Sequence, residues 1–163
     1  MRELARRARV SHNAPYRHFP DRESLLAALA AEGFALLGEA QRAAAEAGDL
    51  RGMGAAYVRF ALEHPQRFRL MFSGQLAIER HAGLRQIAGR AYEALSGALA
   101  QRVPGAEGAR DASIAAWALV HGLAMLLLEE RVAQGALRGR ERDAFVRDVL
   151  SAVRFVARQS QPA

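Results

Sequence analysis

Side chains that can bind a polyanion are present near the N-terminus, between residues 11 and 22. Ser11 is a favourable N-cap for a short helix, which Phe19-Pro20 would end because the residue before a proline avoids the α region. Short polar or basic side chains on the open side of such a helix can reach base edges and phosphates in DNA. We expect His12, Asn13, Ala14 and Arg17 to lie on that side, with Tyr16, His18 and Arg22 donating to the DNA backbone.

A second short helix is predicted just before this one, over residues 2–8. A small residue at Ala5 would let the following helix cross close by, and Val10 would fill the turn between the two. This spacing is typical of a helix-turn-helix, but it also fits two short helices that merely pack within a bundle. The apolar positions that would join the pair are Leu4, Ala5, Ala8, Val10, Tyr16 and Phe19.

Capping residues and helix breakers divide the rest of the chain. Asp21 and Asp49 are favourable N-caps, and Pro65 suits the first position of a helix. Gly48-Asp49 marks a boundary, where we place the junction between a head (residues 1–47) and a body (residues 48–163). Further helices are expected over residues 21–47, 49–64, 65–72, 84–103, 111–132 and 140–158.

Aromatic residues gather in two places in the predicted body. One group lies between residues 57 and 72, and the other repeats at fourfold spacing on the penultimate helix. Helical bundles bind small ligands between their helices, so both groups could line one cavity. Plain core packing gives the same periodicity, and His121 could bond either a ligand or a backbone carbonyl. The candidate ligand residues are Tyr57, Phe60, Phe68, Met71, Phe72, Trp117, His121 and Met125.

The last two predicted helices are apolar over unusually wide arcs. A surface helix needs only one apolar stripe, so the surplus indicates burial, either against a second copy in a four-helix seam or inside the single chain. The candidate interface residues are Leu119, Val120, Leu123, Leu127, Phe145, Val149, Val153 and Val156.

Composition narrows the fold and the chemistry. Hydrophobic residues make up 51% of the 163 residues, mostly Ala and Leu, and aromatics only 7%, so we expect an all-α fold. The net charge of +6 suits a polyanionic partner. GC-rich coding DNA, which enriches arginine, gives the same charge balance. The chain has no cysteine, which excludes disulfides and thiolate metal sites.

The sequence contains no pattern typical of a catalytic site, a metal site or a membrane span. The five histidines show no two-histidine helical spacing with a nearby carboxylate, and neither a glycine-rich phosphate loop nor a nucleophile elbow is present. We therefore expect no catalytic residue, no metal and no cofactor. No uncharged apolar run reaches about 18 residues, and the N-terminus lacks the apolar core of a signal peptide. We expect a cytoplasmic protein with no membrane partner.

The run from Leu4 to Leu26, and above all Tyr-Arg-His-Phe-Pro at residues 16–20, closely resembles the tetracycline-repressor (TetR) family. Trp117, His121 and Gly122 resemble the W…HG motif of one of its subgroups. The resemblance implies a ligand-responsive homodimer that binds double-stranded operator DNA and is most often a repressor, with a small apolar or amphipathic ligand. It assigns the recognition-helix role to Ser11, His12, Asn13, Ala14, Tyr16, Arg17 and His18, and phosphate binding to Arg22.

Two departures from the family pattern matter. Arg9 stands where the family usually has glycine, at a turn position that often needs a positive φ. The chain also begins inside what should be the second helix of the head, which a start-codon choice, a truncation or a true loss would explain. From this truncated head we expect weak DNA binding. The alternative function is a small-molecule-binding or dimerisation module without competent DNA binding.

Overall fold

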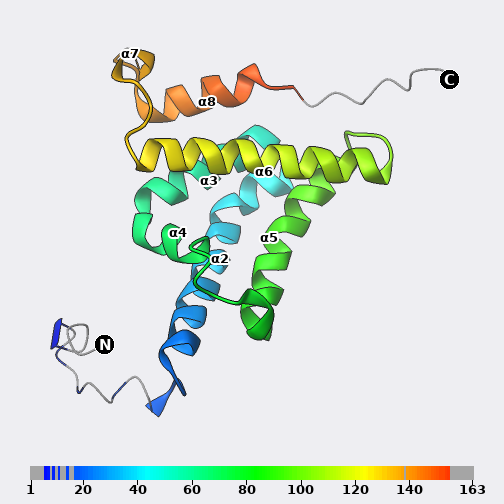
Figure 1. The fold of residues 1–163 in the computed structure, drawn as a ribbon. Helices are drawn as coiled ribbons and strands as arrows, with labels where there is room; N and C mark the ends of the chain where they lie inside the picture. The colour runs from blue at the N-terminus through cyan, green and yellow to red at the C-terminus, as the bar shows by residue number, and fades with distance from the viewer. Residues whose placement is uncertain are drawn as a thin grey trace.

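The structure, a computed structural model, describes residues 6–7, 9, 11, 14, 17–137 and 139–154. Every regular element in these ranges is a helix (Figure 1), so the expected all-α fold is confirmed. In chain order they are α2 (Arg22–Glu46), α3 (Leu50–Glu63), α4 (Pro65–Met71), η2 (Ile78–Arg80), α5 (Ala82–Ala100), α6 (Ala106–Leu128), α7 (Gln134–Leu137) and α8 (Arg142–Ala152).

Helix α2 is the long rod of the molecule, and it begins where its cap predicts. The Asp21 carboxylate accepts a hydrogen bond from the Ser24 backbone N–H at 2.7 Å, and this bond lowers the pKa of Asp21. Glu23 lies in the first turn, where a negative charge complements the helix dipole. The helix has 25 residues, about 37 Å at the usual rise. Its buried face consists of Ala27, Ala30, Gly33, Phe34 and Leu37.

A single turn ends α2 and begins α3. The Gly48 N–H donates to the Ala45 carbonyl at 3.0 Å, and the Asp49 N–H donates to the Ala44 carbonyl at 2.7 Å. Gly48 has a φ of +65°, as the C-terminal glycine of this motif requires. The Asp49 side chain then accepts from the Gly52 N–H at 2.9 Å and caps α3. The sequence boundary at Gly48-Asp49 is therefore a real helix boundary.

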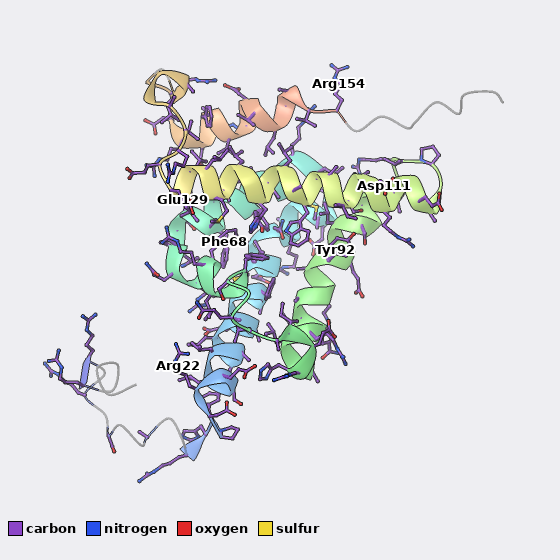
Figure 2. All side chains as sticks on the ribbon, in the orientation of Figure 1. Arg22, Phe68, Tyr92, Asp111, Glu129 and Arg154 are labelled. Atoms are coloured by element: carbon purple, nitrogen blue, oxygen red, sulfur yellow. The ribbon has the colours of Figure 1, made fainter. Side chains whose placement is uncertain are left out.

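The helices pack in two crossing groups (Figure 1). Helix α2 lies beside α5 and also packs on α3 and α4, whereas α6 crosses over α3 and α5, and α8 packs on α3. Phe68 of α4 is fully buried at the centre of the core (Figure 2), with Val58 and Ala61 of α3 and Leu37 of α2. Each helix thus contributes its apolar stripe to one shared core.

Gly33 lets α4 approach α2 closely. A Cβ atom at this position would lie 2.6 Å from the Met71 sulfur, so any side chain there would force the Met71 and Arg67 side chains of α4 to shift. The approach also brings Arg67 of α4 within 3.5 Å of the Glu32 carboxylate. This glycine is therefore needed for packing rather than for backbone freedom.

Three helices have boundaries that differ from those expected. Helix α5 covers 82–100 rather than 84–103, and α6 covers 106–128 rather than 111–132. Gly105, with a φ of +80°, is the N-cap of α6 without a side-chain bond, so no capping side chain marks that start. Helix α8 ends at Ala152, since Val153 is already extended. Helix α7 was not expected at all.

Helix α6 has the length and composition of a membrane span. The core helix of a globular protein meets the same criteria, and α6 packs along α3 and α5. Its buried residues, which lie on one side, are Ala109, Ser113, Ala116, Leu123, Ala124 and Leu127.

The described part of the head agrees with the expected helix pair in one respect and differs in another. Arg6 and Arg7 are helical, and Arg9 has the positive φ expected of its turn position, +55°. The second helix, expected over residues 11–18, is not α-helical at the four described residues Ser11, Ala14, Arg17 and His18. The Ser11 carbonyl accepts from the Ala14 N–H at 2.9 Å. Pro15 has no N–H with which to make the α-type bond instead.

The end of α6 carries avoidable strain. The Arg131 N–H donates to the Leu126 carbonyl at 2.8 Å, and Glu130 occupies the left-handed position at a φ of +53°. A non-glycine residue is disfavoured there. We expect Glu130→Gly to raise the free energy of unfolding by about 0.5–1 kcal/mol, after the entropy cost of glycine is included. Urea denaturation measures this change, and Glu129→Gly, at a residue with φ of −97°, should destabilise instead.

Candidate functional site

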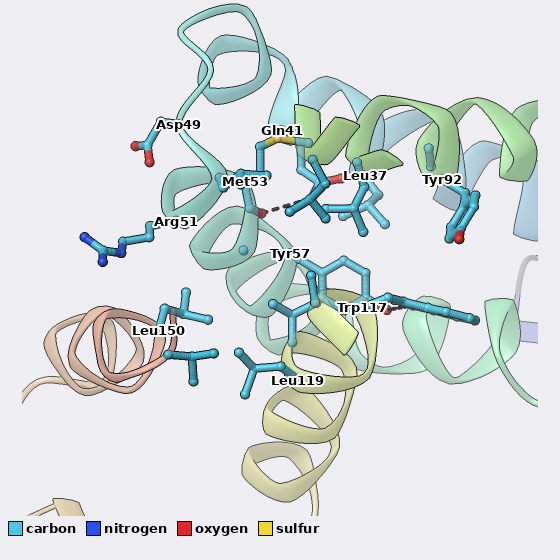
Figure 3. Close-up of a pocket in the computed structure, with 18 of the residues that line it drawn as sticks. Leu37, Gln41, Asp49, Arg51, Met53, Tyr57, Tyr92, Trp117, Leu119 and Leu150 are labelled. Carbon is cyan, nitrogen blue, oxygen red and sulfur yellow. Dashed lines mark hydrogen bonds between the residues drawn. The ribbon is translucent and has the colours of Figure 1, made fainter. Parts of the chain in front are cut away.

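An elongated cavity of about 790 Å³ lies among α2, α3, α5 and α6 and reaches the end of α8 (Figure 3). Its walls are mostly aliphatic and aromatic, and its volume is in the range of sites for small organic ligands. The apolar residues of the wall include Phe34, Leu37, Met53, Tyr57, Phe72, Ala88, Ala91, Leu95, Leu99, Ala116, Trp117, Leu119, Val120 and Leu150.

Three polar side chains form a hydrogen-bonded chain in one wall. The Trp117 indole N–H donates to the Tyr57 hydroxyl oxygen at 3.4 Å. That hydroxyl lies 2.9 Å from Nδ1 of His121, to which it can donate its own hydrogen when Nδ1 is unprotonated. The rings of Phe68 and Phe72 pack against the imidazole at centroid distances of 5.4 and 4.8 Å. His121 thus bonds a side chain, not a backbone carbonyl.

This polar chain carries no charge at neutral pH. Burial lowers the pKa of His121 below its usual value, because the cation loses hydration. Burial likewise raises the pKa of the Tyr57 hydroxyl, an effect that the hydrogen bond from Trp117 opposes. The wall around Tyr57 therefore offers dipoles and rings but no ion.

Charged side chains are confined to the opposite end of the cavity. Asp49, Arg51, Arg102 and Arg154 are among the lining residues there, and all four are exposed. Arg102 donates to the Gly48 carbonyl and to the Ala98 carbonyl at 2.6 Å, which ties the end of α5 to the turn between α2 and α3. Figure 3 shows Arg51 at the edge of the cavity with its guanidinium extending outwards.

The residues expected to bind a ligand divide into wall and core. Tyr57, Phe72 and Trp117 line the cavity. Phe60, Phe68 and Met71 are buried in the core, and Met125 is half-buried against it. His121 does not line the cavity but supports Tyr57 from behind.

Much of the cavity wall was not expected from the sequence. Gln41 of α2 lines it and donates to the Met53 carbonyl at 2.9 Å. The α5 wall contains Ala88 and Ala91, whose small side chains leave room between helices. Periodicity does indicate an apolar stripe on α5, yet it does not show that the stripe borders a space.

The expected dimer residues are used largely inside the single chain. Leu123, Leu127 and Phe145 are buried, and Val149 is half-buried against the core. Leu119, Val120 and Val153 line the cavity, and Val156 lies outside the described residues. Besides Trp117 in the cavity wall, α6 leaves a different apolar stripe exposed: Ile114 (51% exposed), Ala115, Ala118 and Leu126 (48% exposed).

The expected DNA-contacting residues form an exposed group where they are described. Ser11, Arg17, His18 and Arg22 are exposed, and Ala14 is half-buried, as is Phe19. Figure 2 shows Arg22 at the end of α2 remote from α6. His12, Asn13 and Tyr16 lie outside the described residues, so their roles stay predictions.

The N-terminal turn of α2 is tied to the body. Nε2 of His81 lies 3.3 Å from the Glu23 carboxylate, which joins the first turn of α2 to the residue that precedes α5. Both helices also border the cavity, α2 through Phe34 and Leu37 and α5 through Ala91. A displacement of either helix at the cavity would therefore change the contact between Glu23 and His81.

The part of the chain that the structure describes contains no candidate metal site. No group of three or more His, Asp or Glu side chains there could hold an ion.

Comparison with known proteins covers nearly the whole chain. Residues 1–29 match the model of bacterial regulatory proteins of the tetR family, and residues 50–153 match the tetracyclin repressor-like C-terminal domain. No curated protein matches the chain in sequence.

Solved structures show the same fold. A protein of unknown function from Rhodococcus sp. RHA1 superposes with a TM-score of 0.70 at 31% identity, over 93% of this chain and 80% of that one. SCO4313, named as a candidate regulatory protein, gives a TM-score of 0.72 at 24% identity, over 93% and 82%. With its head and body each matching in order, the chain belongs to the tetR family of bacterial regulatory proteins.

Proposed function

We propose that this DNA-binding transcription regulator is a cytoplasmic repressor released from its operator by a small molecule, and that it has no enzymatic activity. The observation that carries the proposal is the position of α2. Its Phe34, Leu37 and Gln41 line the cavity, and its first residues, from Arg22 on, lie within the segment that matches the family's N-terminal model. One rigid element thus borders both sites.

Ligand binding would act through the separation of two heads. A helix-turn-helix dimer binds two half-sites whose spacing must match the protein. A ligand that spreads α2 from α5 would tilt both rods and change that spacing, so operator affinity would fall. The contact between His81 and Glu23 joins the two helices at the base of the head, so spreading them at the cavity would tilt them about this contact.

The homodimer that this mechanism needs would use the outer face of α6. Ile114, Ala118 and Leu126 are exposed on the side opposite the buried stripe. At Gly122 a Cβ atom would meet nothing within 4 Å, so a partner helix could approach closely there. Of the residues expected at the seam, Leu123, Leu127 and Phe145 are buried inside the chain, so we extend the proposed seam to this stripe.

The DNA-binding role predicts the effect of two exposed arginines. Arg17→Ala and Arg22→Ala should each weaken binding to all duplex sequences alike and reduce the salt dependence of log affinity by about one unit. Mobility shifts over a salt series would measure this, with DNA from upstream of the protein's own coding sequence and an unrelated duplex. Asn13→Ala should change sequence preference instead.

Arg147→Ala, on the exposed side of α8, is the control and should leave both duplexes unaffected. A wild-type protein that shifts neither duplex at low salt would favour the alternative, a small-molecule-binding module without DNA function.

Coupling between cavity and head can be tested without knowing the ligand. Ala91→Phe adds a ring in the cavity wall and should imitate a bound ligand, lowering operator affinity by about fivefold or more. Ala94→Phe makes the same change on the exposed side of the same helix and should have no effect. Equal affinities of the two variants by fluorescence anisotropy would rule out release through α5 and α2.

A charge introduced into the proposed dimer seam should make the protein monomeric. Ala118→Arg places a cation in the middle of the exposed α6 stripe, where burial against a partner would be costly. Light scattering should then give a mass near 17.7 kDa instead of twice that value. The matched variant Ala94→Arg should remain dimeric, and a dimeric Ala118→Arg protein would place the interface elsewhere.

A further inference from the structure

The cavity has two chemically different ends. At one end lie Tyr92 and Trp117 (Figure 3), with Phe72 beside Trp117, and none of these lining residues is charged. At the other end, around the turn between α2 and α3, lie Arg51, Arg102, Arg154 and Asp49. A ligand that has one ionised end can therefore satisfy both ends in only one orientation.

The charge at the polar end is net positive. Asp49 supplies the only carboxylate among the lining residues described there, and one of its oxygens already caps α3 through the Gly52 N–H. Arg102 is partly engaged with the Gly48 and Ala98 carbonyls. Arg51 and Arg154 make no ion pair among the described residues. Their guanidinium groups are exposed on long side chains and can turn towards an anion at the cavity edge.

The space between the ends suits an extended apolar body. Along α5 the wall extends from Ala88 to Leu99, about 16 Å at the helical rise. Leu37, Met53 and Leu99 are almost fully buried along this length, so the middle of the cavity excludes a charged group. From these observations we infer that the ligand is an amphipathic anion, an extended apolar chain or ring system with a carboxylate or similar anionic group at the arginine end. The inference rests on the proposed ligand-binding function of the cavity.

Three probes of equal chain length and different head charge test the inference. They are dodecanoate, dodecanol and dodecyltrimethylammonium, at pH 8 and below micelle-forming concentrations. Trp117 is the only tryptophan of the chain and lines the cavity, so its fluorescence reports occupancy. Dodecanoate should bind at least about fivefold more tightly than the other two probes, because only its head is attracted by the arginines.

Variants at the polar end separate the head group from the body. Arg51→Ala should weaken dodecanoate binding about threefold to fivefold, the range for a partly exposed ion pair, and leave dodecanol binding unchanged. Arg51→Lys keeps the charge and should retain most of the dodecanoate affinity. Arg90→Ala, on the exposed side of α5 and outside the cavity, should change neither.

The remaining outcomes would contradict different parts of the inference. Equal affinity for the anion and the cation, or equal losses for dodecanoate and dodecanol in Arg51→Ala, would overturn the anionic head while keeping the cavity as a ligand site. No fluorescence change with any probe would overturn the inference entirely. The Ala91→Phe experiment on DNA would still test the proposed function separately.

Discussion

The burial of one face of α2 is the constraint on which the rest of the molecule depends. Ala30, Phe34 and Leu37 are almost fully buried, and they hold a rod of about 37 Å against three other helices at once. Because backbone hydrogen bonds keep the rod continuous from Arg22 to Glu46, its two ends cannot move independently. The small residues on this face matter as much as the large ones, since Gly33 is what allows α4 and its Met71 to approach.

The cavity follows from where large and small side chains meet around this rod. Phe68 fills the space near α4 and stacks on His121, so that region is solid core, and Phe72 separates it from the cavity. Farther along, Ala88 and Ala91 of α5 and Ala116 of α6 line the cavity, and their small side chains leave space between the helices. Burial lowers the pKa of His121, which favours its neutral form, and the charged lining residues lie at the end near Arg51.

Sequence patterns predict the fold well wherever a capping side chain marks a boundary. Asp21, Asp49 and Pro65 predict the starts of α2, α3 and α4 to within one residue. The start of α6 is missed by five positions because Gly105 caps it with backbone alone. For the cavity, the aromatic clusters indicate Tyr57, Phe72 and Trp117, but helical periodicity is the same for a residue in a wall and one in a solid core. Phe60, Phe68 and Met71 therefore could not be told from wall residues, and Gln41 and Arg51 give no periodic signal.

The position of the W…HG residues on α6 connects the cavity to the proposed seam. Trp117 and His121 are one helical turn apart and both reach Tyr57, whereas Gly122 lies next to His121 but towards the exposed stripe of Ala118. A helix can serve two surfaces at once only if its residues alternate between them at helical spacing. On this part of α6 the Trp117 indole and the His121 imidazole are thus on the side of Tyr57, whereas Gly122 exposes backbone on the outer side. A ligand that displaces Trp117 would also shift the turn of α6 at which a second α6 could pack most closely. Ligand binding in one cavity of the proposed dimer would therefore change the contact between the two subunits.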